Sequence, residues 1–402
     1  MRNFVVLSLA ILIISCKTET ISKLEIGFYK VELLISDFET LPFVIEVTSE
    51  TKLKVFNADE IIEVDEIEYK NDSVFINMPV FEGYLVAKMI NDELHGNFVK
   101  PNLNRIVPFV AKKGKTRFDI NDEAIVDITG SWETVFSPDS DNDMYIAKGI
   151  FKQNGNRVTG TFQTTTGDYR YLDGVVNGDE MKLSTFDGAH AFLFIATVTD
   201  SVMEGMFYSG NHWREPFVAK RNEDYELPSV NELTFLNEGY DKISFSFPDA
   251  QGNLVSLSDE RFKNKIVLVQ IMGTWCPNCL DESKYYANYF KANNDKDIEI
   301  VALAFEYVKT EAKAFGNIKR LVDRIGIEYP VLLAQTGTTS KTKAQEKLPM
   351  LNHVLSYPTT IFIDKKGAVR KIHTGFNGPA TGKKYTAFTA EFESFVGELL
   401  SE

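Results

Sequence analysis

The stretch Gly273-Thr274-Trp275-Cys276-Pro277-Asn278-Cys279-Leu280-Asp281-Glu282 contains two of the three cysteines in this chain of 402 residues. The residues just before it, 266–271, are apolar and β-branched, a pattern that predicts a buried strand. The residues after it, up to position 290, form a segment long enough for a helix. The Cys-x-x-Cys pair is therefore predicted to lie at a strand-to-helix turn, with Cys276 at or just before the start of the helix.

This position predicts a reactive thiol at Cys276. A helix N-terminus offers unpaired N–H groups and about half a positive charge, both of which favour the thiolate. Cysteines at helix N-termini or in Cys-x-x-Cys motifs have their pKa lowered from about 8.5 to roughly 3.5–7.5. Two intervening residues on a helical turn bring the sulfurs close enough to bridge reversibly. We predict that Cys276 attacks, that Cys279 is the buried resolving thiol, and that the two form a redox-active disulfide.

Two structural roles for the cysteine pair compete with redox chemistry. A zinc site usually needs four ligands, and the chain has no second cysteine pair. A static disulfide across two residues would close almost no loop and would stabilise the fold little. Redox chemistry is the preferred interpretation, and we expect neither a metal nor a cofactor.

The composition is that of a globular protein long enough for two or three domains. The formal net charge of −14 argues against binding to nucleic acid. The abundance of Phe and Tyr, 30 and 16 residues, favours β-rich structure.

Residues 1–16 are interpreted as a signal peptide. A short basic start is followed by an apolar run from Phe4 to Ile14, which is too short to span a bilayer. The sequence around Cys16 resembles a bacterial lipoprotein signal, although Ile14 stands where small residues are commoner. We predict that Cys16 is lipidated and anchors the protein in the cell envelope, in the periplasm or at the outer membrane. The alternative is an ordinary secretory signal with an incidental cysteine.

Residues 27–222 are predicted to be all β, in two tandem modules. Short alternating runs are separated by turn signals such as Asn154-Gly155, and there is no convincing long helix. The segment also repeats itself, which divides it into modules at 27–120 and 121–222 that either close as small barrels or share one sandwich. The matching landmarks are 27–29 with 130–132, 94–98 with 203–207, and 108–112 with 216–220. We find no catalytic set there.

Residues 223–240 are polar and contain Pro228, which indicates a linker. From 241 to 402, predicted strands alternate with helices in a mixed α/β layer fold. The strands are predicted near 243–247, 254–257, 266–271, 298–305, 329–333, 359–363 and 369–373, the helices after Cys276, at 310–325 and around 388–399, and a polar surface segment at 335–347. The predicted class is therefore multidomain, with tandem β modules before an α/β domain.

Residues 241–402 resemble the thioredoxin-fold domains of the TlpA/ResA type, which are extracytoplasmic thiol–disulfide oxidoreductases. The resemblance lies in Trp275 with the Cys-x-x-Cys motif, and in Ser356-Tyr357-Pro358-Thr359-Thr360-Ile361-Phe362-Ile363-Asp364. It implies that Pro358 is cis and faces the disulfide, and that the backbone of Tyr357 pairs with a substrate strand. Trp275 and Tyr357 would then bind substrate. The alternative for Pro358 is an ordinary trans proline.

The resemblance also implies a role for Glu282, three residues after Cys279. In ResA-like members a glutamate at this offset is buried near the thiols, where its raised pKa lets it take the proton of the second cysteine. Ordinary thioredoxins use an aspartate six residues before the first cysteine, a position that Gln270 occupies here. The alternative is a solvated helix glutamate, and we expect Asp281 to be exposed. Asn278 departs from the proline that the family often has before the second cysteine, so the redox potential stays open.

The leading hypothesis is an extracytoplasmic reductase of protein disulfides, with disulfide-containing client proteins and an upstream membrane thiol reductant as partners. A peroxidase of the AhpC type is an alternative, but that family needs Thr three residues before its attacking Cys, where this chain has Gly273. In a third reading the β modules bind an envelope partner and carry the main role.

Overall fold

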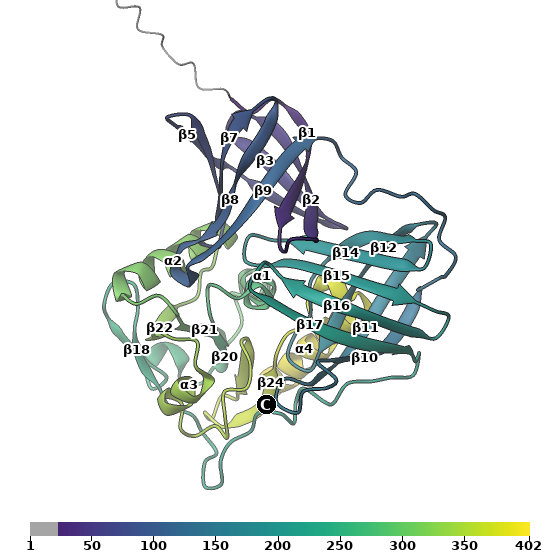
Figure 1. Ribbon diagram of the computed structural model, residues 1–402. Helices are drawn as coiled ribbons and strands as arrows, with labels where there is room; N and C mark the ends of the chain where they lie inside the picture. Colours follow the sequence, from purple (N-terminus) through teal and green to yellow (C-terminus); the bar gives the residue numbers. More distant parts are fainter. Residues whose placement is uncertain (1–22) are drawn as a thin grey trace, which may run out of the picture.

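The computed structural model describes residues 23–402, so Cys16 and most of the segment before the first strand lie outside the described residues. Three parts follow one another along the chain: an open β-sheet, a closed β-barrel and an α/β part (Figure 1). The predicted class, tandem β modules followed by an α/β thioredoxin-fold domain, is confirmed. No helix within 23–402 combines the length and apolar character needed to cross a bilayer.

The first sheet has nine antiparallel strands in the order β4-β3-β2-β1-β9-β8-β7-β6-β5. Alternate side chains of its strands point into an apolar core, as the period of two in the sequence requires. The strands are β1 (Gly27–Leu34), β2 (Thr40–Ser49), β3 (Lys52–Asn57), β4 (Glu60–Val64), β5 (Glu66–Lys70), β6 (Ser73–Asn77), β7 (Tyr84–Ile90), β8 (Glu93–Lys100) and β9 (Arg105–Lys113).

The second β unit is a closed barrel, in which β10 pairs with both β11 and β17. Its interior is filled by aromatic side chains, among them the fully buried Trp132, Phe136 and Phe194. The strands are β10 (Gly130–Phe136), β11 (Tyr145–Asn154), β12 (Arg157–Thr164), β13 (Leu172–Asn177), β14 (Glu180–Phe186), β15 (Ala191–Val198), β16 (Val202–Ser209) and β17 (Trp213–Arg221).

The two β units carry the sequence repeat at equivalent places. Gly96 pairs with Phe109 in the first sheet, and Gly205 pairs with Phe217 in the barrel. Each glycine lies where a Cβ atom would collide with the strand beside it. The repeat is therefore structural, although only the second unit closes into a barrel.

The α/β part is built on a five-stranded sheet in the order β22-β21-β20-β23-β24. The three central strands are buried on both faces, since helices and loops cover the sheet on each side. The elements are β18 (Ser246–Pro248), β19 (Leu254–Ser256), β20 (Ile266–Met272), α1 (Pro277–Ala292), β21 (Ile298–Phe305), α2 (Glu311–Ile325), β22 (Val331–Gln335), α3 (Lys341–Lys347), β23 (Thr359–Ile363), β24 (Val369–Thr374) and α4 (Lys383–Ser401).

Two local features differ from the sequence prediction. The polar segment 335–347 contains the short helix α3, which is capped by Ser340 and packs Ala344 into the core. The segment 223–240 has no helix or regular strand, but it lies against the α/β part: Leu236 bridges to Leu351, and Thr234 is buried.

The three parts pack against one another. Phe43 of the first sheet stacks on Phe186 of the barrel with ring centroids 4.1 Å apart, and the core of the first sheet takes in Val175 and Leu193 from the barrel. Helix α1 lies near the point where all three parts meet (Figure 1).

Candidate active site

The cysteine pair lies where β20 ends and α1 begins. Cys276 is the N-cap residue of α1, with an extended backbone, and its Sγ accepts a hydrogen bond from the backbone N–H of Cys279 at 3.1 Å. Pro277 takes the first helical position, where the missing N–H costs nothing. The two cysteines are joined by a disulfide, with Cα atoms 5.2 Å apart. Cys276 is 6% exposed and Cys279 is fully buried, so Cys276 is the more exposed residue of the pair.

The loop before β23 faces the disulfide. The Tyr357–Pro358 peptide bond is cis, and the carbonyl oxygen of Tyr357 lies 3.5 Å from Cys276 Sγ. The ring of Trp275 packs edge-on against Tyr357 with centroids 5.5 Å apart, and its Nε1 donates to the Phe305 carbonyl at 2.9 Å. The structure therefore brings Trp275, Tyr357 and Pro358 together around the cysteines.

Glu282 is fully buried in α1, three residues after Cys279, and lies close to the central strands. Gln270 Nε2 donates to its carboxylate at 2.8 Å, and the hydroxyls of Thr360 and Tyr286 donate at 2.9 and 3.3 Å. Burial raises the pKa of Glu282 to about 7, against the lowering effect of these three donors. A carboxyl with this pKa can accept or release a proton near neutral pH.

A second buried carboxyl, Glu306, was missed by the sequence reasoning. It accepts from the backbone N–H of Thr274 at 2.8 Å and from the Thr274 hydroxyl at 2.7 Å, which holds the loop just before Cys276. Burial raises the pKa of Glu306 to about 7. Its place directly after the buried strand β21 is the signal that could have identified it, because polar residues at the carboxyl ends of parallel strands gather at one edge of a sheet.

The barrel contributes a loop, residues 165–171 between β12 and β13, that lies on the cysteine motif. Asn278 Nδ2 donates to the Asp168 carbonyl at 3.3 Å, and Ser356 Oγ, next to Tyr357, donates to the Thr166 carbonyl at 3.2 Å. The backbone N–H of Gly378 donates to the Asp168 carboxylate at 2.6 Å. This barrel loop therefore covers the disulfide on the Asn278 side.

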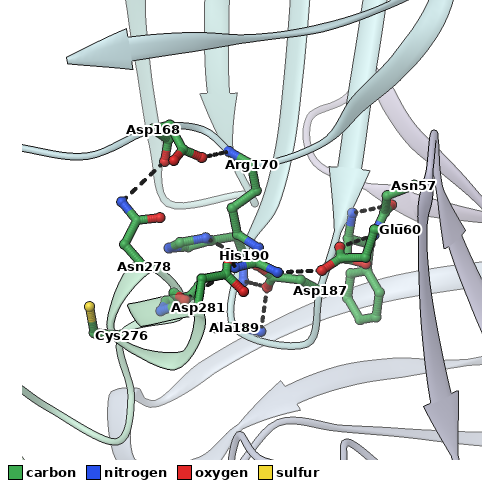
Figure 2. A network of polar contacts seen from close by, with 12 residues as sticks. Asn57, Glu60, Asp168, Arg170, Asp187, Ala189, His190, Cys276, Asn278 and Asp281 are labelled. Carbon is green, nitrogen blue, oxygen red and sulfur yellow. Dashed lines mark hydrogen bonds and ion pairs between the residues drawn. The ribbon is translucent and has the colours of Figure 1, made fainter. Parts of the chain in front are cut away.

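Arg170, at the end of the barrel loop, joins all three parts of the molecule (Figure 2). Its guanidinium is fully buried, donates to the Pro277 carbonyl at 3.1 Å, and pairs with Asp281 of α1, with Glu60 of β4 and, at 3.2 Å, with Asp187 of the barrel. Burial alone would lower the pKa of Arg170, but these carboxylates hold it above its usual value. The expectation that Asp281 is exposed was wrong: only 9% of its side chain is exposed, because Arg170 covers it.

Within residues 23–402, no group of three or more His, Cys, Asp or Glu side chains is arranged to hold a metal ion.

Known proteins match the part of the chain that carries this site. The AhpC/TSA family model matches residues 239–372. Thioredoxin-like protein YneN of Bacillus subtilis is 29% identical over 151 residues, which cover 38% of this chain and 79% of YneN. Thiol-disulfide oxidoreductase ResA of the same organism is 31% identical over 140 residues, which cover 35% of this chain and 69% of ResA. The solved structure of a thiol-disulfide oxidoreductase from Bacteroides fragilis is 20% identical, covers 37% of this chain and 99% of its own, and aligns with a TM-score of 0.27.

Proposed function

The chain belongs to the ResA-like thiol-disulfide oxidoreductases, and on this premise we propose that Cys276 and Cys279 reduce disulfides in client proteins outside the cytoplasm. One observation carries the proposal: a disulfide at a helix start whose outer sulfur faces the backbone carbonyl of Tyr357 at 3.5 Å. A substrate strand could pair with that backbone while its own disulfide meets Cys276.

The first step begins from the reduced pair. The Cys276 thiolate attacks one sulfur of the client disulfide, so that the client S–S bond breaks and a Cys276–client disulfide forms. The second client sulfur leaves as a thiolate and takes a proton from solvent. The hydrogen bond from Cys279 N–H and the start of α1 both favour the thiolate at Cys276.

The second step releases the client. Cys279 gives its proton to Glu282 and attacks Cys276 Sγ, which expels the remaining client thiolate and leaves the Cys276–Cys279 disulfide. Two electrons have then moved from the dithiol to the client. We propose that a membrane thiol carrier reduces the pair again, and that Pro358 keeps a backbone N–H away from the sulfurs.

Single cysteine variants test the assignment. We expect Cys276→Ser to abolish reduction of a model protein disulfide, because the attacking atom is lost. We expect Cys279→Ser to accumulate a mixed disulfide with the client, which non-reducing gel electrophoresis and mass spectrometry detect. Full activity in Cys276→Ser would rule out the proposal, and rapid peroxide consumption by the wild type would favour the peroxidase alternative.

We also propose that Cys16, which lies outside the described residues, is lipidated and holds the protein at the envelope membrane. The sequence of residues 1–16 supports this proposal. Metabolic labelling with a fatty acid should mark the wild type and leave Cys16→Ser unmarked.

A further inference from the structure

A cavity of about 350 Å³ lies where the three parts meet, and it ends at the active site. Thr274 and Trp275, which directly precede Cys276, form one end. Its apolar wall is built from the first sheet and the barrel and includes Phe81, Phe98 and Phe192. The cavity is therefore not a feature of the α/β part alone, since the β units supply most of its surface.

The cavity reaches the residues that lead into the cysteine motif, since Thr274 and Trp275 line it while the cysteines themselves lie behind them. Cys276 belongs to the same buried cluster as Val80, Phe81 and Ala189, and all three line the cavity. At Asn278, within the motif, the barrel loop makes a hydrogen bond to the cysteine motif. A substrate segment held in the cavity would therefore lie beside the two residues that precede Cys276.

Two cationic side chains line this cavity without a carboxylate partner among the described residues. Lys100 Nζ donates only to the Ala189 carbonyl, at 2.6 Å, and Arg105 makes no side-chain hydrogen bond or ion pair within 23–402. Glu82 also lines the cavity, but its carboxylate is taken up by Tyr307 at 3.0 Å and by Lys313 and Asn102. The nearby Asp187 is engaged by Arg170 and His190.

The pKa values of the cavity groups are shifted in the direction expected for buried cations. Burial lowers the pKa of Lys100 to about 8 and also lowers the pKa of Arg105. Burial, together with Arg105 and Lys100, lowers the pKa of His212 to about 4. An anion bound between these groups would relieve both the desolvation and the mutual repulsion.

We propose that this cavity binds the segment beside the substrate disulfide, and that it selects a segment that carries a carboxylate next to an apolar side chain. The proposal rests on the proposed function and names its substrate class. A volume of about 350 Å³ is at the lower end of the range for ligand pockets, so it admits a few side chains of an extended strand and not a folded surface. The carboxylate would lie at Lys100 and Arg105, and the apolar group would contact Phe81, Phe98 and Phe192.

The test uses the full-length protein, reduced beforehand, and three synthetic peptides with the same intramolecular disulfide. The peptides differ in one residue beside the disulfide, which is Glu, Gln or Lys and is followed by Phe. We expect kcat/KM to be about tenfold higher for the Glu peptide than for the Lys peptide, the effect of one charge-assisted hydrogen bond. Oxidised glutathione, a small disulfide with carboxylates, is a fourth probe. Its rate relative to the Glu peptide shows whether the cavity takes its carboxylate from a free small disulfide or from a peptide segment.

Variants locate the selectivity. Lys100→Gln with Arg105→Gln should bring the ratio of kcat/KM between the Glu and Lys peptides close to one, and Arg105→Lys should keep the preference for Glu. Arg214→Gln, an exposed site on β17 outside the cavity, is the matched control. Equal rates for the three peptides, or a preference that survives the double variant, would overturn the inference alone. Failure of the wild type to reduce any probe would instead count against the proposed function.

Discussion

At the scale of single residues, two buried carboxyls flank the cysteine motif. Glu282 lies behind it in α1, and Glu306 holds Thr274 in front of it. Each has its pKa raised to about 7, mainly by burial. Both groups therefore hold a proton in the folded state at pH values where the unfolded chain has lost it.

The pH dependence of stability follows from this difference. Between the ordinary value of 4.5 and about 7, the folded state binds more protons than the unfolded state, so the free energy of unfolding falls as the pH rises. The contribution of each protonated carboxyl to the free energy of unfolding is fully present below pH 4.5 and is lost as the pH rises through about 7. Glu282→Gln has no such proton to lose, so its free energy of unfolding should fall less over this window. The difference between its fall and that of the wild type should be about 3 kcal/mol at most. Urea titrations at pH 4.5 and pH 8 measure this, and parallel pH profiles for the two proteins would contradict it.

The same substitution should slow the second chemical step. Without a proton acceptor, Cys279 forms its thiolate less readily, and we expect the mixed disulfide to resolve about a hundredfold more slowly, the size of a typical general-base contribution. A rapid-quench time course of the mixed disulfide near pH 7 measures this rate. Glu282→Asp, which keeps a carboxyl, is the control and should retain part of the rate.

How far single residues could be predicted depends on where their partners lie in the chain. The burial of Glu282 and the cis bond at Pro358 were both implied by the family resemblance. The burial of Asp281 depends on Arg170, 111 residues earlier and in a different part of the fold. A local pattern contains no information on such a partner, so the sequence predicted the wrong exposure.

At the scale of elements, local signals predicted most helices and strands of the α/β part. Helix α2 was predicted at 310–325; it begins after its N-cap Thr310 and ends at Gly326, which has the left-handed conformation. Helix α3 was missed because Ala344 is the one apolar residue among its seven and the one that is buried. The sequence left open whether the modules close as small barrels or share one sandwich, since closure depends on the pairing of β10 with β17, which lie far apart in sequence.

The contact between the barrel loop and the cysteine motif can be tested at Gly375. This residue has φ +80°, and an added Cβ would lie 2.4 Å from the Thr166 carbonyl oxygen. Gly375→Ala should therefore displace the barrel loop. Because the loop would then open locally more often, we expect iodoacetamide to alkylate reduced Cys276 about threefold faster or more. Gly367→Ala is the matched control, because Gly367 has φ +81° and its Cβ would meet only Lys242 Nζ at 3.8 Å. Equal alkylation of the two variants would show that the loop does not limit access.

At the scale of the whole molecule, Arg170 is the charge that holds the three parts together (Figure 2). Its loss would leave the carboxylates of Glu60, Asp187 and Asp281 facing one another in a buried site. Removing one partner of a buried ion pair costs about 3–5 kcal/mol, whereas an exposed pair contributes about 1 kcal/mol or less.

We therefore expect Arg170→Met to lower strongly the urea concentration at which the protein begins to unfold. Arg324→Met is the control, because Arg324 of α2 pairs with Asp65 of the first sheet at 2.8 Å, also between two parts of the molecule but in a much more exposed position. The expected shift for the control is small. Similar urea concentrations for both variants would mean that the buried cluster does not hold the parts together.

The Arg170 cluster also bears on how the protein is made. Along the chain Glu60 comes first, then Arg170 and Asp187, and only later Asp281 with the two thiols, so a chain that emerges N-terminus first presents its domains for folding in that order. Both β units can thus be complete before the thiols emerge. A newly synthesised Cys276 then docks against a finished surface and is sheltered early from cross-linking with unrelated thiols, a hazard that would be greatest in an oxidising compartment.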